Sequence, residues 1–152
     1  ENAVLKIEEE LSRYKHTGSF SAFDKTEIYY EYFLCENASA NAVLVHGLSE
    51  FSQKYHEQIY YLLNQGYNVF TFDLRGHGLS DRLTNQIDLL HVGKFDDYVK
   101  DLSQFIETVV IPKIEPKYST LTIIIVVVAA VVFSCAVIAY ILHRLNKKNI
   151  LK

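Results

Sequence analysis

Residues 121–142 form an apolar run that contains no charged side chain. A helix of that length would rise about 33 Å, enough to cross the roughly 30 Å hydrocarbon core of a bilayer. Tyr118 and Tyr140 stand near its two ends, as interfacial aromatic residues do, and cations follow directly. We therefore expect a single membrane-spanning helix over 118–143, followed by a basic tail over 144–152.

The same run has a rival interpretation, because nine of the residues from 121 to 132 are β-branched. Such residues favour strands, so a strand followed by a core helix of an α/β enzyme also fits. Nothing else in the chain supplies partners for so much apolar surface, however. In lipid the backbone must satisfy its own hydrogen bonds, which enforces a helix whatever the propensities. The membrane helix is therefore the preferred interpretation.

Charge is divided unevenly along the chain. Residues 1–117 carry 11 Lys/Arg and 18 Asp/Glu, a net of −7, whereas 118–152 carry four cations and no acid. An acidic body argues against nucleic acid as a partner, since phosphate binding needs a basic face. The basic tail beside the apolar run predicts membrane lipid as a partner instead. The cation bias, with the sequon Asn37-Ala38-Ser39, favours an extracellular body and a cytoplasmic tail.

Patterning before the apolar run predicts alternating helices and strands. The expected elements are a leading helix over 1–14, an antiparallel hairpin over 19–35 that turns at Asp24-Lys25, buried strands over 41–47 and 67–74, a helix capped by Ser52 that stops at Gly66, and an amphipathic helix over 95–109 closed by Pro112. Strand–helix–strand–helix order after a hairpin predicts an α/β sheet with parallel strands and right-handed crossovers.

Two loops follow the predicted parallel strands, where α/β sheets bind their ligands. They read "VLVHGLSEF" over 43–51 and "FDLRGHGLSD" over 72–81, and "HVGKFDDYVKDLSQFI" over 91–106 comes next. Together, in this order, they resemble the lysophospholipase and monoacylglycerol lipase group of α/β-hydrolases, from about Thr17 to Lys117. We therefore expect 1–117 to be a partial α/β-hydrolase domain.

The resemblance implies roles for both loops. In the first, the Leu48 N–H would donate to the oxyanion of a tetrahedral intermediate, with His46, Gly47 and Glu50 shaping the turn. Gly47 suits a backbone that must approach closely and take positive φ. In the second loop, the residues expected to brace the floor of the site rather than react are Asp73, Arg75, Gly76, His77 and Gly78. Ser49 and Ser80 are polar loop residues in this interpretation.

The nucleophile of this family sits on a sharp turn between a strand and a helix, in a Gly-x-Ser-x-Gly motif. Counting on from Lys117 places that turn over 125–130 and puts Val127, which has no nucleophilic atom, at the serine position. Ser134 is a weak alternative, because apolar residues replace the glycines around it. The family's acid and histidine have no counterpart in this sequence.

Two functions therefore stay open. The first is a serine ester hydrolase by family, with lysophospholipid or monoacylglycerol substrates, that is inactive as this chain alone. The second is a membrane-anchored, non-catalytic binding module. A complementing chain that supplies the missing strands and catalytic groups would reconcile them. Neither function predicts a cofactor or a metal ion.

Overall fold

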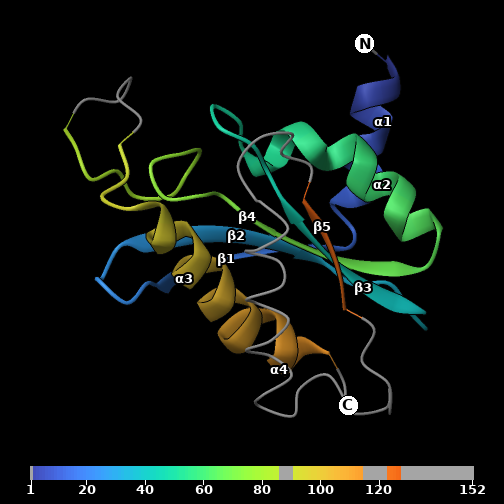
Figure 1. Cartoon of the computed structure of the whole chain (residues 1–152). Coiled ribbons are helices and arrows are strands. Elements are labelled where there is room, and N and C mark those ends of the chain that lie inside the picture. The colour runs from blue at the N-terminus through green and yellow to red at the C-terminus, as the bar shows by residue number, and fades with distance from the viewer. Residues whose placement is uncertain (1, 86–90, 115–122, 128–152) are drawn as a thin grey trace.

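The computed structural model describes residues 2–85, 91–114 and 123–127. Helix α1 (Asn2–Leu11) leads into a hairpin of β1 (Lys15–Ser21) and β2 (Glu27–Phe33), which pair antiparallel (Figure 1). The hairpin turns at Lys25, whose φ is 70° and whose N–H donates to the Ala22 carbonyl at 2.9 Å. The leading helix and the hairpin predicted from the sequence are both confirmed.

Two parallel strands follow, joined by a helical crossover. They are β3 (Ala40–Val45) and β4 (Tyr67–Phe72), and the crossover comprises a short 3₁₀ turn, η1 (Ser52–Tyr55), and α2 (His56–Asn64). Gly66 stops the helix with a φ of 79°, as its position in the sequence predicts.

The predicted cap at Ser52 is wrong. Its side chain makes no capping hydrogen bond, and residue Phe51 occupies the N-cap position of η1. Both the N–H and the hydroxyl of Ser52 donate to the buried Asp73 carboxylate. A helix cap would use the Ser52 hydroxyl oxygen as an acceptor of a backbone N–H, whereas here the charged Asp73 carboxylate binds the hydroxyl as a donor in a stronger hydrogen bond.

The amphipathic segment forms α3 (Phe95–Phe105), a π-helical stretch, η2 (Ile106–Val110), and a last turn, α4 (Ile111–Lys113). Pro112 has no N–H to donate, and its ring would clash with the carbonyl four residues earlier, so a wider turn just before it relieves both problems. The chain leaves the helix at Ile114, whose backbone is extended. The predicted helix is therefore present, with its end shaped by the proline.

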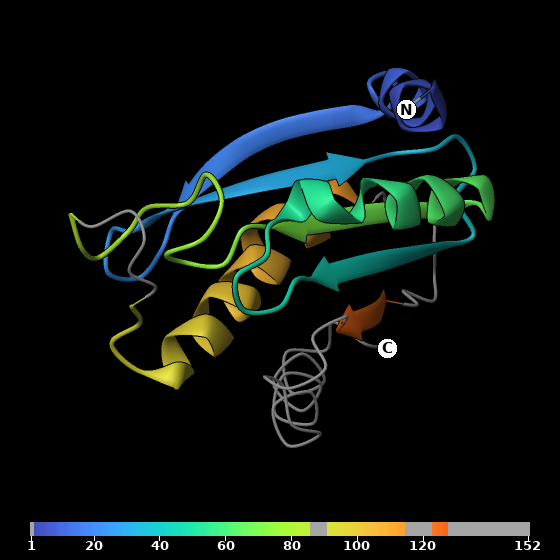
Figure 2. The ribbon, with the colours of Figure 1, turned by 90° about the horizontal axis from the view of Figure 1, so that it is seen from above.

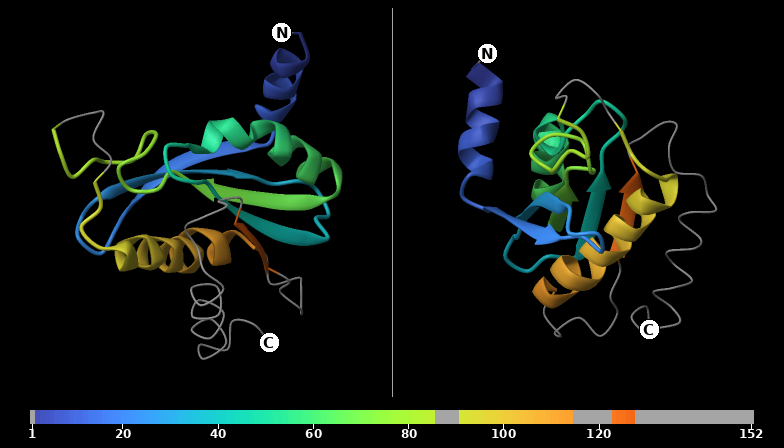
Figure 3. Two further views of the ribbon diagram at one scale, coloured as in Figure 1. Left: turned by 45° about the horizontal axis from the view of Figure 1, so that its top comes forward. Right: turned by 90° about the vertical axis from the view of Figure 1, so that its left-hand side faces the viewer.

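The sheet has the order β1-β2-β4-β3-β5, so β1 and β5 (Ile123–Val127) are its outer strands (Figure 2). Helix α2 covers one face and α3 the other (Figure 3). Along β3, Val43 and Val45 pack toward α3 while Leu44 packs toward α2. Because both faces are covered, the parallel strands read as continuous apolar runs rather than alternating ones.

The expected membrane helix is wrong for residues 123–127. They form β5, which pairs parallel with β3 in a register that sets Ile123 opposite Asn41 and Val127 opposite Val45. The β-branched residues that counted against a helix in water are those that suit a strand, and β3 offers a backbone to pair with. The rival strand interpretation is thus confirmed here. Of the sharp turn expected over 125–130, residues 125–127 belong to the strand instead, and residues 128–130 lie outside the described residues.

The remaining residues of the expected span, Ser134 and the basic tail lie outside the described residues. None of the helices in the described part of the chain has the length and apolarity that a membrane crossing requires.

Candidate active site

Two loops leave the same edge of the sheet because β3 and β4 run parallel. The first follows β3 and spans residues 46–51; the second follows β4 and spans 73–81. His46 joins them. Its Nε2 accepts a hydrogen bond from the Leu74 N–H at 2.9 Å, and its Nδ1 lies 2.7 Å from the Gly47 carbonyl oxygen. Nδ1 must therefore carry the proton and donate it.

This geometry requires a neutral imidazole, since one ring nitrogen accepts while the other donates. His46 is 1% exposed, and burial lowers its pKa below the usual range for histidine, which favours the same state. A ring committed at both nitrogens has no lone pair left to act as a base. His46 is thus placed to hold the two loops together.

The first loop is clamped by Glu50. Its carboxylate accepts a hydrogen bond from the Gly47 N–H at 3.0 Å and another from the Tyr55 hydroxyl. Those two donors, the hydroxyl foremost, lower the pKa of Glu50. The positive φ expected at Gly47 falls on Ser49 instead, at 63°. The Leu48 side chain is 61% exposed, and within the described residues its N–H makes no hydrogen bond.

Asp73 organises the start of the second loop. One carboxylate oxygen accepts from the Ser52 N–H at 2.7 Å and from the Ser52 hydroxyl at 2.5 Å, while the other accepts from the Leu79 N–H at 2.8 Å. A Cβ at Gly78 would lie 2.0 Å from that second oxygen, and the φ of Gly78 is 48°. Glycine is therefore required here both by space and by backbone conformation.

Arg75 fixes the second loop to the rest of the fold. Its buried guanidinium makes two hydrogen bonds of 2.7 Å to Asp101 on α3 and a third, also 2.7 Å, to Asp24 in the hairpin turn. Burial alone would lower the pKa of Arg75, but the two carboxylates outweigh it and raise the pKa. In return, the guanidinium lowers the pKa of Asp24 to about 2.

Strand β2 supports the loop from the other side. The Tyr29 N–H donates to the Ser80 hydroxyl at 2.9 Å, and that hydroxyl donates to the Asp73 carbonyl at 2.6 Å. The Glu27 N–H donates to Asp81 at 3.0 Å. Gly76, with a φ of 79°, closes the loop by donating its N–H to the Asp81 carbonyl. Ser80 is thus buried with its hydroxyl committed in both directions.

His77 is the least satisfied group in the loop. It is buried, and its Nδ1 lies 3.0 Å from the Arg75 carbonyl oxygen, so that nitrogen donates. Its Nε2 has no hydrogen-bond partner among the described residues. Across the described ranges no serine or threonine hydroxyl is hydrogen-bonded to a histidine, so they contain no nucleophile–base pair. Nor do they contain a His/Cys/Asp/Glu group that could hold a metal ion.

A cavity of about 360 Å³ lies between the two loops on the β2 side. Its lining includes both apolar and polar residues, which are Tyr29, Phe51, Gln53, Asp73, Gly78, Leu79 and Arg82. Leu79 is 67% exposed at its rim.

Sequence reasoning missed Asp101, which pairs with Arg75. The signal was present: Asp101 lies beside Leu102 and Tyr98 on the apolar stripe of its helix, where an acid needs a partner. The segment over 91–106 that carries part of the resemblance includes Asp101, but the resemblance gave this residue no role.

The strand order, the crossover and the two loops at the carboxyl ends of β3 and β4 define an α/β-hydrolase fold. The family model for serine aminopeptidase S33 hydrolases matches residues 36–124. The chain therefore belongs to this family.

Among curated relatives, lysophospholipase L2 of Escherichia coli K12 is 33% identical over 93 residues, which cover 61% of this chain and 27% of that protein. The probable lysophospholipase L2 of Haemophilus influenzae is 40% identical over 67 residues, covering 44% and 21% respectively. The chain thus spans about a quarter or less of the length of these relatives.

Solved structures support the fold. A lipase in its open form aligns with a TM-score of 0.56 at 18% identity, covering 74% of this chain and 36% of that one. A thermostable carboxyl esterase from Bacillus coagulans aligns with a TM-score of 0.54, also at 18% identity, covering 62% and 31%. At such identities the likeness extends to the fold alone.

Proposed function

We propose that this chain forms the oxyanion-binding part of a serine ester hydrolase that acts on lysophospholipids or monoacylglycerols. The observation that carries the proposal is the loop after β3. Glu50 holds the Gly47 N–H, and His46 holds the Gly47 carbonyl, so the next amide, that of Leu48, is fixed in place with no acceptor among the described residues. A preorganised N–H of this kind stabilises a developing oxyanion without further rearrangement.

The position of the loop supports the same proposal. Val45 ends β3 opposite Val127 at the end of β5, so the Leu48 loop leaves the sheet edge beside the strand that precedes the nucleophile turn in α/β-hydrolases. Apolar side chains also gather at this edge: Leu48, Phe51 and Leu79 are all exposed. Such a surface suits a substrate that carries an acyl chain.

The substrate class rests on the lysophospholipase L2 relatives and on that apolar edge. The sequence contains no Gly-x-Ser-x-Gly motif. We infer that these 152 residues alone do not hydrolyse esters, and that the nucleophile, acid and histidine would have to be supplied from outside them, for example by a complementing chain.

A chimera tests the proposal. The matching part of E. coli lysophospholipase L2 is replaced by residues 17–127 of this chain, and lysophospholipid hydrolysis is measured. Leu48→Pro removes the donor N–H, and Leu48→Ala, the matched control, keeps it. We expect Leu48→Ala to retain the chimera's rate and Leu48→Pro to lower kcat by roughly 10²–10³-fold, the usual effect of deleting one oxyanion donor. Equal activity of the two variants would refute the assignment of Leu48.

The chain alone is tested with a fluorophosphonate probe, for which we expect no labelling. An adduct that disappears in Ser134→Ala would overturn this expectation. Membrane association stays a prediction for the part of the span outside the described residues. Carbonate-resistant membrane binding, together with a chimera that hydrolyses nothing, would instead favour the non-catalytic, membrane-anchored module.

A further inference from the structure

A second group of charged side chains lies away from the loops, between the sheet and α1. At its centre is Glu31 of β2, which is fully buried. One of its carboxylate oxygens accepts from the Lys15 ammonium at 2.7 Å and from the Tyr29 hydroxyl at 2.9 Å. The other lies 2.8 Å from Nε2 of His56, the first residue of α2. Glu31 is therefore surrounded by donors from three elements.

His56 also faces α1. Its Nδ1 lies 2.7 Å from a carboxylate oxygen of Glu8, and the ring is 4% exposed. Carboxylates only accept hydrogen bonds, so both ring nitrogens must donate, and only the doubly protonated imidazolium has two N–H groups. Burial alone would lower the pKa of His56, but the hydrogen bonds to Glu31 and Glu8 outweigh it and raise the pKa. The raised pKa of His56 thus favours the same imidazolium form that its two contacts with carboxylates require.

Few other contacts hold α1. Leu11 is buried with Phe33 and Ile59, and Ile7 packs on the same cluster. Val4 and Leu5 are 62% and 65% exposed, so the outer half of the helix is mostly exposed in the described structure. Figure 3 shows α1 projecting from the body of the fold. The Glu8–His56 contact therefore supplements the apolar contacts of Leu11 and Ile7 in attaching this helix.

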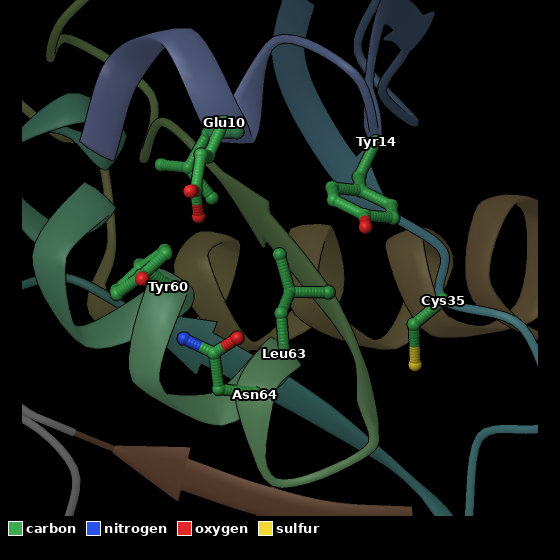
Figure 4. Close-up of a pocket in the computed structure, with 7 residues that line it drawn as sticks. Glu10, Tyr14, Cys35, Tyr60, Leu63 and Asn64 are labelled. Carbon is green, nitrogen blue, oxygen red and sulfur yellow. The ribbon is translucent and has the colours of Figure 1, made fainter. Parts of the chain in front are cut away.

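The packing between α1 and α2 leaves a gap beside Leu11. A cavity of about 80 Å³ lies between α1 and α2 there (Figure 4). Its lining residues are Glu10, Leu11, Tyr14, Cys35, Tyr60, Leu63 and Asn64. Cys35 is partly buried at the edge of this space, and burial raises the pKa of its thiol. Movement of α1 away from α2 would uncover the thiol.

We propose that α1 is a pH-dependent clasp, which is closed on α2 while His56 carries two ring protons and opens when His56 loses one. A neutral ring can donate to only one of the two carboxylates. Glu31 is fully buried and retains Lys15, so it keeps the remaining N–H. The Glu8 side chain is 46% exposed and can be solvated by water instead. The contact that fails is therefore the ion pair that joins α1 to α2.

The direction of the pH effect follows from the raised pKa of His56. The contact is complete below the ordinary histidine pKa of about 6.5 and is lost as the pH rises through the raised value. At the acid end, burial alone would raise the pKa of Glu31, but hydrogen bonds from His56 and Lys15 outweigh it and lower the pKa. The Glu31 contacts therefore persist below the ordinary glutamate pKa of about 4.3.

The full-length chain tests the clasp, in a Cys135→Ser background that leaves Cys35 as the sole thiol. Hydrogen exchange of the α1 amides, corrected for intrinsic rates, is compared at pH 6 and pH 9. Cys35 alkylation by N-ethylmaleimide is measured in parallel and normalised to the urea-unfolded chain at each pH. We expect both readouts to report about fivefold more opening at pH 9, the factor for a half-exposed ion pair worth about 1 kcal/mol.

Glu8→Gln and Glu9→Gln form a matched pair on α1, because Glu9 is exposed and its carboxylate has no hydrogen bond or ion pair within the described residues. Glu9→Gln should keep the wild-type pH profile, whereas Glu8→Gln should be open at both pH values. A wild-type profile in Glu8→Gln would overturn the proposal. So would pH-independent opening of the parent chain, a result that requires no variant to fold.

Discussion

The buried ion pair of Arg75 and Asp101 offers the sharpest test of how the second loop is held. Both side chains are fully buried, and two hydrogen bonds of 2.7 Å join them. Arg75→Leu leaves the Asp101 carboxylate buried without a donor, a change that typically costs about 3–5 kcal/mol. Loss of the Asp24 contact adds little, since that carboxylate is a third exposed. We expect Arg75→Leu to lower the free energy of unfolding by about 4 kcal/mol.

The matched control and the double variant separate charge from packing. Arg13→Leu removes an exposed arginine and should change stability by less than about 0.5 kcal/mol. Arg75→Leu/Asp101→Leu removes both charges. It should be at least about 2 kcal/mol more stable than Arg75→Leu alone, because an apolar pair replaces a buried ion pair at little cost. Urea unfolding followed by circular dichroism measures all three.

Two results would refute this reasoning. One is an Arg75→Leu variant within about 1 kcal/mol of the parent chain, which would mean that Asp101 finds another donor or takes up a proton cheaply. The other is a double variant that is no more stable than Arg75→Leu alone, which would mean that the Asp101 charge is not what destabilises Arg75→Leu. If Arg75→Leu alone does not fold, recovery of folding in the double variant is the expected outcome.

Three further predictions concern the two loops. Gly78→Ala, whose Cβ would lie 2.0 Å from an Asp73 oxygen at a φ of 48°, should lower the free energy of unfolding by at least about 2 kcal/mol in urea titrations. The pKa of Asp24, about 2, lies below its unfolded value, so its contribution is present above about pH 4 and lost as the pH falls through 2. The stability difference between the parent chain and Asp24→Asn should therefore shrink between pH 4 and pH 2. Glu50→Gln removes the charged acceptor of the Gly47 N–H and should speed hydrogen exchange at that amide by roughly tenfold.

Local patterns predicted the scaffold well because each element carries its own signal. The hairpin turn at Lys25, the helix stop at Gly66 and the two buried parallel strands all follow from short-range chemistry that tertiary contacts leave unchanged. The π-helical stretch before Pro112 follows the same logic in retrospect, since the ring forbids an ordinary turn.

The sequence was least informative where residues distant in the chain determine a side chain's partners. Ser52 has the side chain of a helix cap, but Asp73, 21 positions later, takes its hydroxyl. Glu31 shares the face of its strand with Phe33, and only the fold brings Lys15 and His56 to neutralise it. An acidic residue within an apolar pattern indicates that a buried carboxylate needs a partner, but the sequence does not identify the partner residue.

The apolar run beginning at residue 121 illustrates a limit that applies to any single sequence. A strand buried on both faces and a helix in lipid produce the same signal, an unbroken series of apolar residues. Length favoured the helix, and β-branched composition favoured the strand. The conformation of residues 123–127 is determined by β3. The outer side of that strand has a row of backbone donors and acceptors that only an extended neighbour can satisfy. The requirement to pair that backbone belongs to the fold as a whole, so it outweighs a preference read from the run alone.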